Sequence, residues 1–303
     1  MKFPVRIIFF WGSMLNQLII NAQHPIRMQS VDQQIRDSIH RSGAHIAVAF
    51  KDLQTGDALY INEKQVYHAA STMKFPVLIE LYQQAAENKI SLADSLRLVN
   101  SFPSIVDSSL YSLNAQDDTE TRLYNKLGQK MAIRDLARLM IVRSSNLATN
   151  TLVQLVRPAS VMQTLKQLGA YDTRVLRGVE DQKAYDKGLN NTTTAFDLAL
   201  LYEQLAKKEL VSKKAAQSML NILMDQQLNA IIPALLPQDV KVAHKTGNIE
   251  GLQHDSGVVF LPDGRKYVLV LLSTFPPEQT GETIQTLAHI SKLIYDAETA
   301  QKH

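Results

Sequence analysis

The sequence predicts an α+β fold, in which helices flank an antiparallel sheet and an all-α lobe is inserted between two groups of strands. Two observations favour this fold. Strand-like segments occur near both ends of the 303-residue chain, and the long stretch between them carries apolar residues at the three- and four-residue spacing of helices. Two strand groups separated in this way can join into one sheet, so we expect a site in the cleft between the two lobes.

The first group of elements precedes residue 71. Residues 30–43 have the apolar pattern of an amphipathic helix. Residues 44–53 and 57–62 follow as two strand-like segments, and the polar, glycine-containing stretch 54–57 reads as the turn between them.

The middle of the chain, residues 71–208, is mainly helical. Two of its segments, 98–128 and the loop 176–191, are less regular. The helical segments share apolar residues on one face and cover residues 77–88, 132–156, 160–170 and 194–208.

Strands return near the end. Residues 240–247 read as one strand, and 256–274 as a hairpin around a Pro-Asp-Gly turn, before a final helix over 280–299. We therefore expect one intertwined domain. Its sheet lobe is formed by residues 24–70 plus 211–303, and its all-α lobe by residues 71–210.

The N-terminus predicts export. Lys2 and Arg6 precede a short apolar stretch over 7–20, which is typical of a secretory signal peptide spanning residues 1–23, with cleavage near Ala22 or Gln23. An N-terminal membrane anchor and a buried helix are the alternatives. No other stretch approaches the roughly 20 apolar residues of a membrane helix, so we expect a periplasmic or secreted protein without a membrane partner after cleavage.

Composition excludes several classes of site. The chain has no cysteine, which removes disulfides, thiolate metal ligands, a cysteine nucleophile and the acylation point of a lipoprotein. Its net charge of +3, two charges of which lie in the first 23 residues, and its lack of a basic stripe argue against a nucleic-acid partner. No His/Asp/Glu cluster has zinc spacing, so we expect no metal and no cofactor.

Three short motifs carry possible chemistry. The first is Ser71-Thr72-Met73-Lys74. A serine hydroxyl needs a base to become a nucleophile, and a lysine one helical turn away can act as that base if its ammonium loses its proton. The helix N-terminus adds free N–H groups and partial positive charge. A capped helix start explains this motif equally well when it is taken alone.

The second motif is Ser144-Ser145-Asn146, and the third is Lys245-Thr246-Gly247. In the second, a hydroxyl can pass a proton to a leaving group and an amide can hold a carbonyl; the alternative is a polar helix cap. In the third, the lysine supplies fixed charge and the glycine permits close approach of a substrate backbone. The alternative is a solvated strand end that leads into a turn.

Together the three motifs, in this order, resemble the penicillin-recognising serine hydrolases, and class A β-lactamases most closely. The tract 190–195 before a helix, and the Lys-Thr-Gly strand followed by a strand, Pro-Asp-Gly and a second strand, match as well. The resemblance covers roughly residues 30–300. It implies a β-lactamase-like α+β fold with the active site between the lobes.

For the reaction, the resemblance implies that Ser71 is acylated, with Lys74 as its base or proton-relay partner. Ser144 would pass a proton to the lactam nitrogen. The backbone N–H groups of Ser71 and Asn248 would form the oxyanion hole.

For substrate binding, the resemblance implies that Asn146 binds the substrate amide, and that Lys245 and Thr246 bind its carboxylate beside Gly247. The family's Ser-Asp-Asn is Ser-Ser-Asn here. The missing aspartate has a supporting role in the family, so we expect the chemistry to survive.

The loop that carries the water-activating glutamate in the family departs further from the family pattern here. The family places a glutamate two residues after an arginine, with an asparagine four further on. Here Val179 holds the first position, because the acid, Glu180, comes three residues after Arg177, and Ala184 replaces the asparagine. Glu180 or Asp181 could still reach the water if the loop is rewound, with Asn190 or Asn191 as helper. The alternative is that Glu180 is a solvated loop acid.

A histidine, His254, stands where class A enzymes often have an arginine after Lys-Thr-Gly. We expect it to bind a carboxylate when protonated, or to donate a hydrogen bond when neutral, with Asp255 holding it. Beside the cleft, His68 is expected to pack against the sheet.

The sequence thus favours an exported, monomeric serine β-lactamase that acts on a small-molecule β-lactam. Two alternatives keep the fold. One is a D,D-peptidase-like or other envelope amide or ester hydrolase that deacylates β-lactams slowly, and the other is a non-catalytic penicillin-binding sensor.

Overall fold

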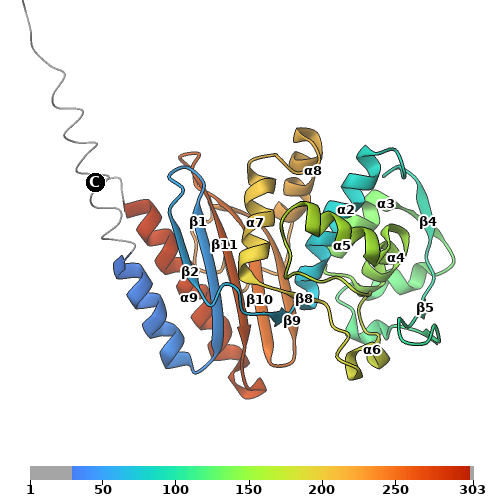
Figure 1. Cartoon of the computed structure of the whole chain (residues 1–303), viewed down its shortest axis with the longest axis horizontal. Helices are drawn as coiled ribbons and strands as arrows, with labels where there is room; N and C mark the ends of the chain where they lie inside the picture. Colours follow the sequence, from blue (N-terminus) through green and yellow to red (C-terminus); the bar gives the residue numbers. More distant parts are fainter. Residues whose placement is uncertain (1–28, 301–303) are drawn as a thin grey trace, which may run out of the picture.

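The computed structural model describes residues 29–300, so the predicted signal peptide lies outside the described residues. A five-stranded sheet with the order β2-β1-β11-β10-β9 forms one part of the molecule (Figure 1). All four neighbouring pairs are antiparallel, which confirms the prediction that the two strand groups join into one sheet. Its strands are β1 (His45–Asp52), β2 (Ala58–Ile61), β9 (Lys241–Ile249), β10 (Leu252–Phe260) and β11 (Lys266–Thr274).

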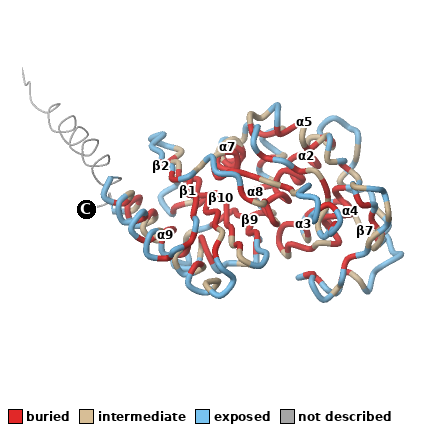
Figure 2. Tube along the Cα trace, turned by 60° about the horizontal axis from the view of Figure 1, so that its bottom comes forward, coloured by how far each residue is buried: buried red, intermediate tan, exposed pale blue. Residues whose placement is uncertain are grey.

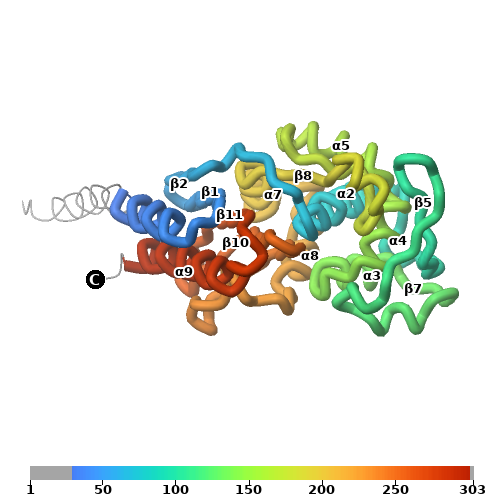
Figure 3. The backbone as a smooth tube through the Cα atoms, turned by 90° about the horizontal axis from the view of Figure 1, so that it is seen from below, coloured from blue at the N-terminus to red at the C-terminus, as the bar shows by residue number. Residues whose placement is uncertain are grey.

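Both faces of the sheet are covered. In β1, Ile46, Val48 and Phe50 alternate with Ala47 and Ala49, and the two sets belong to separate hydrophobic clusters. The first set packs with the N-terminal helix (residues 29–42) and α9 (Thr280–Thr299), which lie side by side in Figures 1 and 3. This double coverage explains the near-continuous apolar runs in the central strands, since alternate side chains of a strand point to opposite faces.

The second face carries α7 (Ala195–Ala206), which contacts β1, β10 and β11. Helix α7 lies inside the range 71–210 that we assigned to the all-α lobe, yet it packs directly on the sheet. Phe75 of α2 stacks on Tyr202 of α7, with ring centroids 4.1 Å apart, and so ties the helical lobe to the sheet. Buried residues run continuously through this junction, as Figure 2 shows.

The helical lobe is built around α2 (Lys74–Ala86), which contacts α3, α4 and α5. Its other helices are α3 (Ile133–Val142), α4 (Asn146–Val156), α5 (Pro158–Gln167) and the short α6 (Gln182–Asp186), and α8 (Lys213–Met224) lies between this lobe and β9.

The irregular segments contain short pieces of structure. Three two-stranded ladders pair β3 (Tyr67–His68) with β8 (Thr192–Thr193), β4 (Ser95–Arg97) with β7 (Lys130–Ala132), and β5 (Phe102–Pro103) with β6 (Leu110–Tyr111). The 3₁₀ turns are η1 (Ala70–Met73), η2 (Ala115–Asp117), η3 (Thr121–Lys126) and η4 (Pro277–Gln279).

The strand that carries Lys245-Thr246-Gly247 is longer than expected. It continues to Ile249, and only Glu250 and Gly251 separate it from β10. Gly251 has φ of 72°, a left-handed conformation that suits glycine in such a tight hairpin. The tripeptide therefore lies inside β9, an edge strand of the sheet that faces the helical lobe.

Candidate active site

A cavity of about 920 Å³ lies between the two lobes. Its wall includes Ser71, Asn146, Glu180 and Asn248, which come from four separate segments of the chain. A smaller cavity of about 500 Å³ lies between α8 and β9 and contains none of the predicted site residues. The larger cavity is therefore the candidate active site.

Ser71 lies in η1, which follows the short strand β3 after Ala69 and leads into α2. The turn is a 3₁₀ helix rather than the start of the α-helix, which begins at Lys74. Residues three apart in a 3₁₀ helix are eclipsed. Ser71 and Lys74 are thus one such turn apart, with Lys74 at the C-terminal end of η1.

Lys74 is fully buried, and its ammonium nitrogen is surrounded by oxygens from one loop. Nζ donates to the Ser144 carbonyl at 2.6 Å, to Ser144 Oγ at 3.2 Å and to Asn146 Oδ1 at 2.8 Å. Burial lowers the pKa of Lys74 to about 7, against the opposing negative charges of Asp118 and Glu180. A substantial fraction of Lys74 is therefore neutral near pH 7, which is what a base requires.

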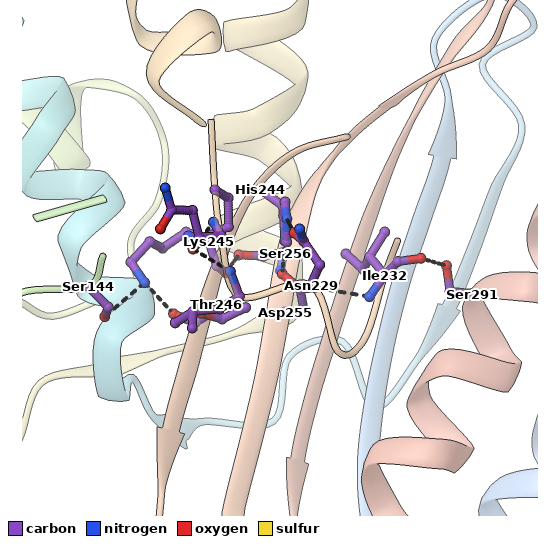
Figure 4. A network of polar contacts seen from close by, with 12 residues as sticks. Ser144, Asn229, Ile232, His244, Lys245, Thr246, Asp255, Ser256 and Ser291 are labelled. Carbon is purple, nitrogen blue, oxygen red and sulfur yellow. Dashed lines mark hydrogen bonds and ion pairs between the residues drawn. The ribbon is translucent and has the colours of Figure 1, made fainter. Parts of the chain in front are cut away.

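Ser144 joins two lysines. Its Oγ accepts from Lys245 Nζ at 3.0 Å as well as from Lys74, and Figure 4 shows the contact with Lys245. Ser144 has φ of 54°, an uncommon value for a non-glycine residue, in the link between α3 and α4. This conformation turns both its carbonyl and its hydroxyl toward Lys74.

Lys245 is also fully buried. Its Nζ donates to the Thr246 carbonyl at 2.8 Å, and burial, followed by the positive charge of Lys74, holds its pKa well below the ordinary value. Within residues 29–300, Thr246 Oγ1 is buried without a hydrogen-bond partner, although buried hydroxyls normally have one. The pair thus combines a buried amine, whose charged form is disfavoured, with a hydroxyl that has no partner among the described residues.

Gly247 lets β9 approach the nucleophile. A Cβ at this position would lie 3.1 Å from the Thr72 backbone nitrogen and 3.2 Å from that of Ser71. We expected the glycine to admit a substrate backbone; the structure shows that it admits the Ser71 turn. Any side chain here would push β9 away from that turn.

Glu180 reaches the site through Asn146, whose Nδ2 donates to Glu180 Oε1 at 2.6 Å. Glu180 has φ of 62°, a left-handed backbone conformation, so the path of the loop changes direction at this residue. Burial raises the pKa of Glu180, and the charges of Asp117 and Asp118 add to this effect, while Asn146 and Lys74 oppose it. A chain of contacts therefore runs from Lys74 through Asn146 to Glu180.

Asn150 explains why the loop lies there. It is four residues after Asn146 in α4, so the two amides share one face of the helix. Asn150 Oδ1 accepts from Val179 N at 2.7 Å, and its Nδ2 donates to Val179 O at 3.1 Å. A Cβ on Gly178 would lie only 2.3 Å from Asn150 Oδ1, so glycine is required for this close approach.

The proposed helpers of Glu180 have other partners. Asn190 Oδ1 accepts from Arg177 Nη2 at 3.0 Å, and Asn191 bonds the backbone of Leu176 and Arg177. Asp181 is buried and accepts from Ser104 Oγ and Ile105 N. These side chains hold the loop together, and Asn146 is the amide that contacts Glu180, while assistance by Asn190 or Asn191 stays a prediction.

Asp118, like Asn150, is a site residue that no sequence motif indicated. Asp118 Oδ2 accepts the backbone N–H groups of Asn146 and Leu147, both at 2.9 Å, and the hydroxyl of Tyr124 at 3.0 Å. It also receives the Ser145 hydroxyl at 3.3 Å. A carboxylate from the irregular segment 98–128 thus lies beside the Ser-Ser-Asn motif, which itself lacks the family's aspartate.

The prediction that His254 binds a carboxylate is wrong. The residue is fully buried, and burial lowers its pKa to about 4, so it is neutral. Its Nε2 lies 3.0 Å from the His68 carbonyl, inside the protein. Asp255 does not hold it: Figure 4 shows Asp255 contacting His244 and the Ile232 backbone instead, at 2.8 and 3.0 Å. His68 itself lines the cavity.

The fold and this set of motifs define a class of two-lobed serine hydrolases. The model of the beta-lactamase enzyme family matches residues 30–297, and the chain belongs to that family. It is 25% identical to a β-lactamase of Bacteroides uniformis, over 92% of this chain and 94% of that protein. It is 22% identical to β-lactamase VEB-1 of Pseudomonas aeruginosa, over 98% of each protein.

Among solved structures, PBP-A is similar. A mutant of that protein, described as an acyl-enzyme complex with penicillin G, aligns with a TM-score of 0.76 and 27% identity, over 89% of this chain and 96% of PBP-A. The predicted fold class and family resemblance are thereby confirmed.

No helix within residues 29–300 combines the length and apolar character needed to cross a membrane. The same range contains no group of three or more His, Cys, Asp or Glu side chains arranged to hold a metal ion.

Proposed function

We propose that this member of the family is a serine β-lactamase that hydrolyses β-lactams through an acyl-enzyme on Ser71. The observation that carries the proposal is the buried Lys74, which contacts Ser144 and Asn146 in the cleft that also contains Ser71 and Glu180. The site combines a nucleophile, a neutral amine, a relay hydroxyl and a carboxylate in one place.

In the acylation step, neutral Lys74 takes the proton of Ser71 as Oγ attacks the lactam carbonyl carbon. Charge develops on the carbonyl oxygen, where the backbone N–H groups of Ser71 and Asn248 stabilise it. The C–N bond then breaks. The lactam nitrogen receives the Ser144 hydroxyl proton, and Lys74 returns a proton to Ser144 through their 3.2 Å contact.

Substrate binding uses the sheet side of the cleft. Lys245 and Thr246 bind the carboxylate of the substrate, and Asn146 binds its amide. The unpaired Thr246 Oγ1 supports this assignment.

In the deacylation step, Glu180 removes a proton from water as the water attacks the ester carbonyl of the acyl-enzyme. The ester bond to Ser71 breaks and the serine oxygen recovers a proton. A carboxylate with a raised pKa is a stronger base than a free one, so the partly desolvated carboxylate of Glu180 at the cavity wall suits this role.

The test is hydrolysis of a chromogenic cephalosporin by the purified protein. We expect Ser71-dependent turnover, with Ser71→Ala reduced to the background rate. Ser95→Ala, a change of an exposed serine in β4 outside the cleft, is the matched control and should keep wild-type activity. Turnover that survives in Ser71→Ala, or no turnover at all in the wild type, would contradict the proposal.

A second candidate is a D,D-peptidase-like enzyme that is acylated by β-lactams but releases them slowly. The similarity to PBP-A, captured as an acyl-enzyme with penicillin G, favours it. The two functions differ in one observable quantity, the lifetime of the adduct on Ser71.

We also propose that the protein is exported after removal of residues 1–23 and acts as a monomer. The charged and apolar pattern of the N-terminus supports export. N-terminal sequencing of the exported protein and size-exclusion chromatography test the two statements.

A further inference from the structure

The turn that leads into Ser71 is strained and tightly held. Ala70 has φ of 44°, a left-handed conformation that is unfavourable for a residue with a Cβ. Such conformations persist only where surrounding contacts enforce them. Two histidines that the reaction scheme above does not use, His68 and His254, contact this turn.

The His68 side chain holds the turn from within. Its Nδ1 lies 3.0 Å from the backbone nitrogen of Ala70. A backbone N–H can only donate, so Nδ1 must be the acceptor and carries no proton. Burial, followed by the positive charge of Arg177, lowers the pKa of His68 and keeps the ring neutral.

His254 holds the same turn from the sheet. Its Nδ1 lies 3.1 Å from the backbone nitrogen of Ser273 and 2.9 Å from the Gln253 carbonyl. A carbonyl can only accept, so Nε2 carries a proton and donates to the His68 carbonyl at 3.0 Å. The ring is fully buried and packs edge-on against Tyr67, with centroids 5.9 Å apart.

The Ala69 backbone is also paired, whereas His68 Nε2 is buried without a hydrogen-bond partner among residues 29–300. The Ala69 N–H donates to the Asn191 carbonyl at 2.8 Å, and the Ala69 carbonyl accepts from Thr72 N at 3.0 Å and from Thr72 Oγ1 at 2.6 Å. The peptide units 68–69 and 69–70 are therefore fixed at both their N–H and their C=O groups. The next peptide unit contains the Ser71 N–H.

We propose that His68 and His254 are positioning residues that aim the Ser71 N–H into the oxyanion hole. This inference rests on the proposed function. The second N–H of the hole, that of Asn248, belongs to β9, which touches the Ser71 turn at Gly247. The distance between the two donors thus depends on how the turn is held, and an oxyanion hole works only when both donors are preorganised.

The kinetic test compares two substitutions of His68. His68→Asn keeps an acceptor at the Nδ1 position, because an asparagine side chain readily accepts from the N–H two residues later. His68→Leu removes it. At saturating cephalosporin, we expect the single-turnover acylation rate constant of His68→Leu to fall about 10- to 100-fold, with little change in the binding constant. The acylation rate constant of His68→Asn should stay within about threefold of wild type.

His254 offers an independent pair. His254→Gln keeps a donor for the His68 carbonyl, while His254→Leu does not, so only the leucine variant should lose acylation rate. Wild-type acylation in both leucine variants would overturn the proposal. So would losses in His68→Asn and His254→Gln as large as those in the corresponding leucine variants.

A structural readout separates this inference from the proposed function. Hydrogen exchange of the Ala70–Thr72 amides should accelerate in both leucine variants and stay near the wild-type rate in His68→Asn and His254→Gln. If the wild type is never acylated, the proposed function fails, but this pattern still decides whether the histidines hold the turn. Unchanged exchange in the leucine variants contradicts that role.

Discussion

Lys74 is the residue on which the chemistry depends most. Burial removes the hydration of its ammonium, while three oxygens of the Ser144–Asn146 segment and the charges of Asp118 and Glu180 partly restore the stability of the charged form. The balance leaves its pKa at about 7. A small change in this charge balance therefore changes the fraction of neutral base near physiological pH.

Substitution of Glu180 should reveal this balance. The Glu180 carboxylate raises the pKa of Lys74, so Glu180→Gln should lower it and leave the amine neutral at more acidic pH. We expect the acid limb of the acylation rate to move downward by roughly one pH unit, measured by stopped flow between pH 5 and about 9. An acid limb that stays in place or moves upward would show that Lys74 is not the base under the influence of Glu180.

The residues of the three motifs could be predicted from the sequence because their chemical types and spacing carry the information. The side-chain direction of His254 could not. Its position in the chain places it opposite Gly247 in the ladder between β9 and β10, close to the site. Only the packing of β3 over that strand shows that the ring is covered and contacts the His68 carbonyl.

At the scale of elements, the N-terminus of α4 organises the site. Asn146 is its first residue, and the exposed N–H groups of this turn need acceptors. Ser145 accepts from Ala148 N at 3.3 Å, and Asp118 accepts from the first two N–H groups. A negative charge at a helix N-terminus is also favourable for the helix dipole. Asp118 thus stabilises the helix that presents Asn146 to Lys74.

Replacement of Asp118 should affect stability and catalysis together. We expect Asp118→Ala to lower the free energy of unfolding by about 1–3 kcal/mol, because several buried donors lose their acceptor, and to slow acylation. Urea denaturation and single-turnover kinetics measure the two effects. Tyr124→Phe removes only one of these donors and serves as the matched control, with a loss that should be clearly smaller. Equal stability of Asp118→Ala and wild type would contradict this role.

The role of Asp118 could not be predicted from the sequence, for a physical reason. It lies in the segment 98–128, which has no helical or strand periodicity, and it acts across 27 residues on Ser145. The regular helices and strands could be predicted because the spacing of their apolar residues reflects burial on one face. The predicted final helix over 280–299 and the single antiparallel sheet are confirmed for this reason.

At the scale of the whole molecule, the face of the sheet remote from the cleft carries a buried acid, Glu298. Glu298 of α9 is 1% exposed, and Arg265 Nη1 donates to its carbonyl at 2.8 Å. Burial, with an added contribution from the negative charge of Asp52, raises the pKa of Glu298 from 4.5 to about 8. The folded protein therefore holds a proton that the unfolded chain releases above pH 4.5.

The sign of the resulting pH dependence follows. The stability that Glu298 contributes is complete below pH 4.5 and is lost as the pH rises toward about 8. Glu298→Gln stays neutral, so its stability relative to wild type should increase over this window by up to about 3 kcal/mol. Unfolding free energies at pH 5 and about 8.5 give the comparison. Because α9 is remote from the cleft, β-lactam turnover should be unchanged, and a pH-independent stability difference would contradict the expectation.

The central claim is that an acyl group forms on Ser71 and that Glu180 directs its removal. Intact-protein mass spectrometry after mixing with a penicillin tests it most directly, on wild type, Ser71→Ala and Glu180→Gln. We expect the wild type to return rapidly to its free mass, Glu180→Gln to retain an adduct with the mass of the intact drug on Ser71, and Ser71→Ala to show none. An adduct that persists equally in wild type and Glu180→Gln, or that forms in Ser71→Ala, would contradict the account.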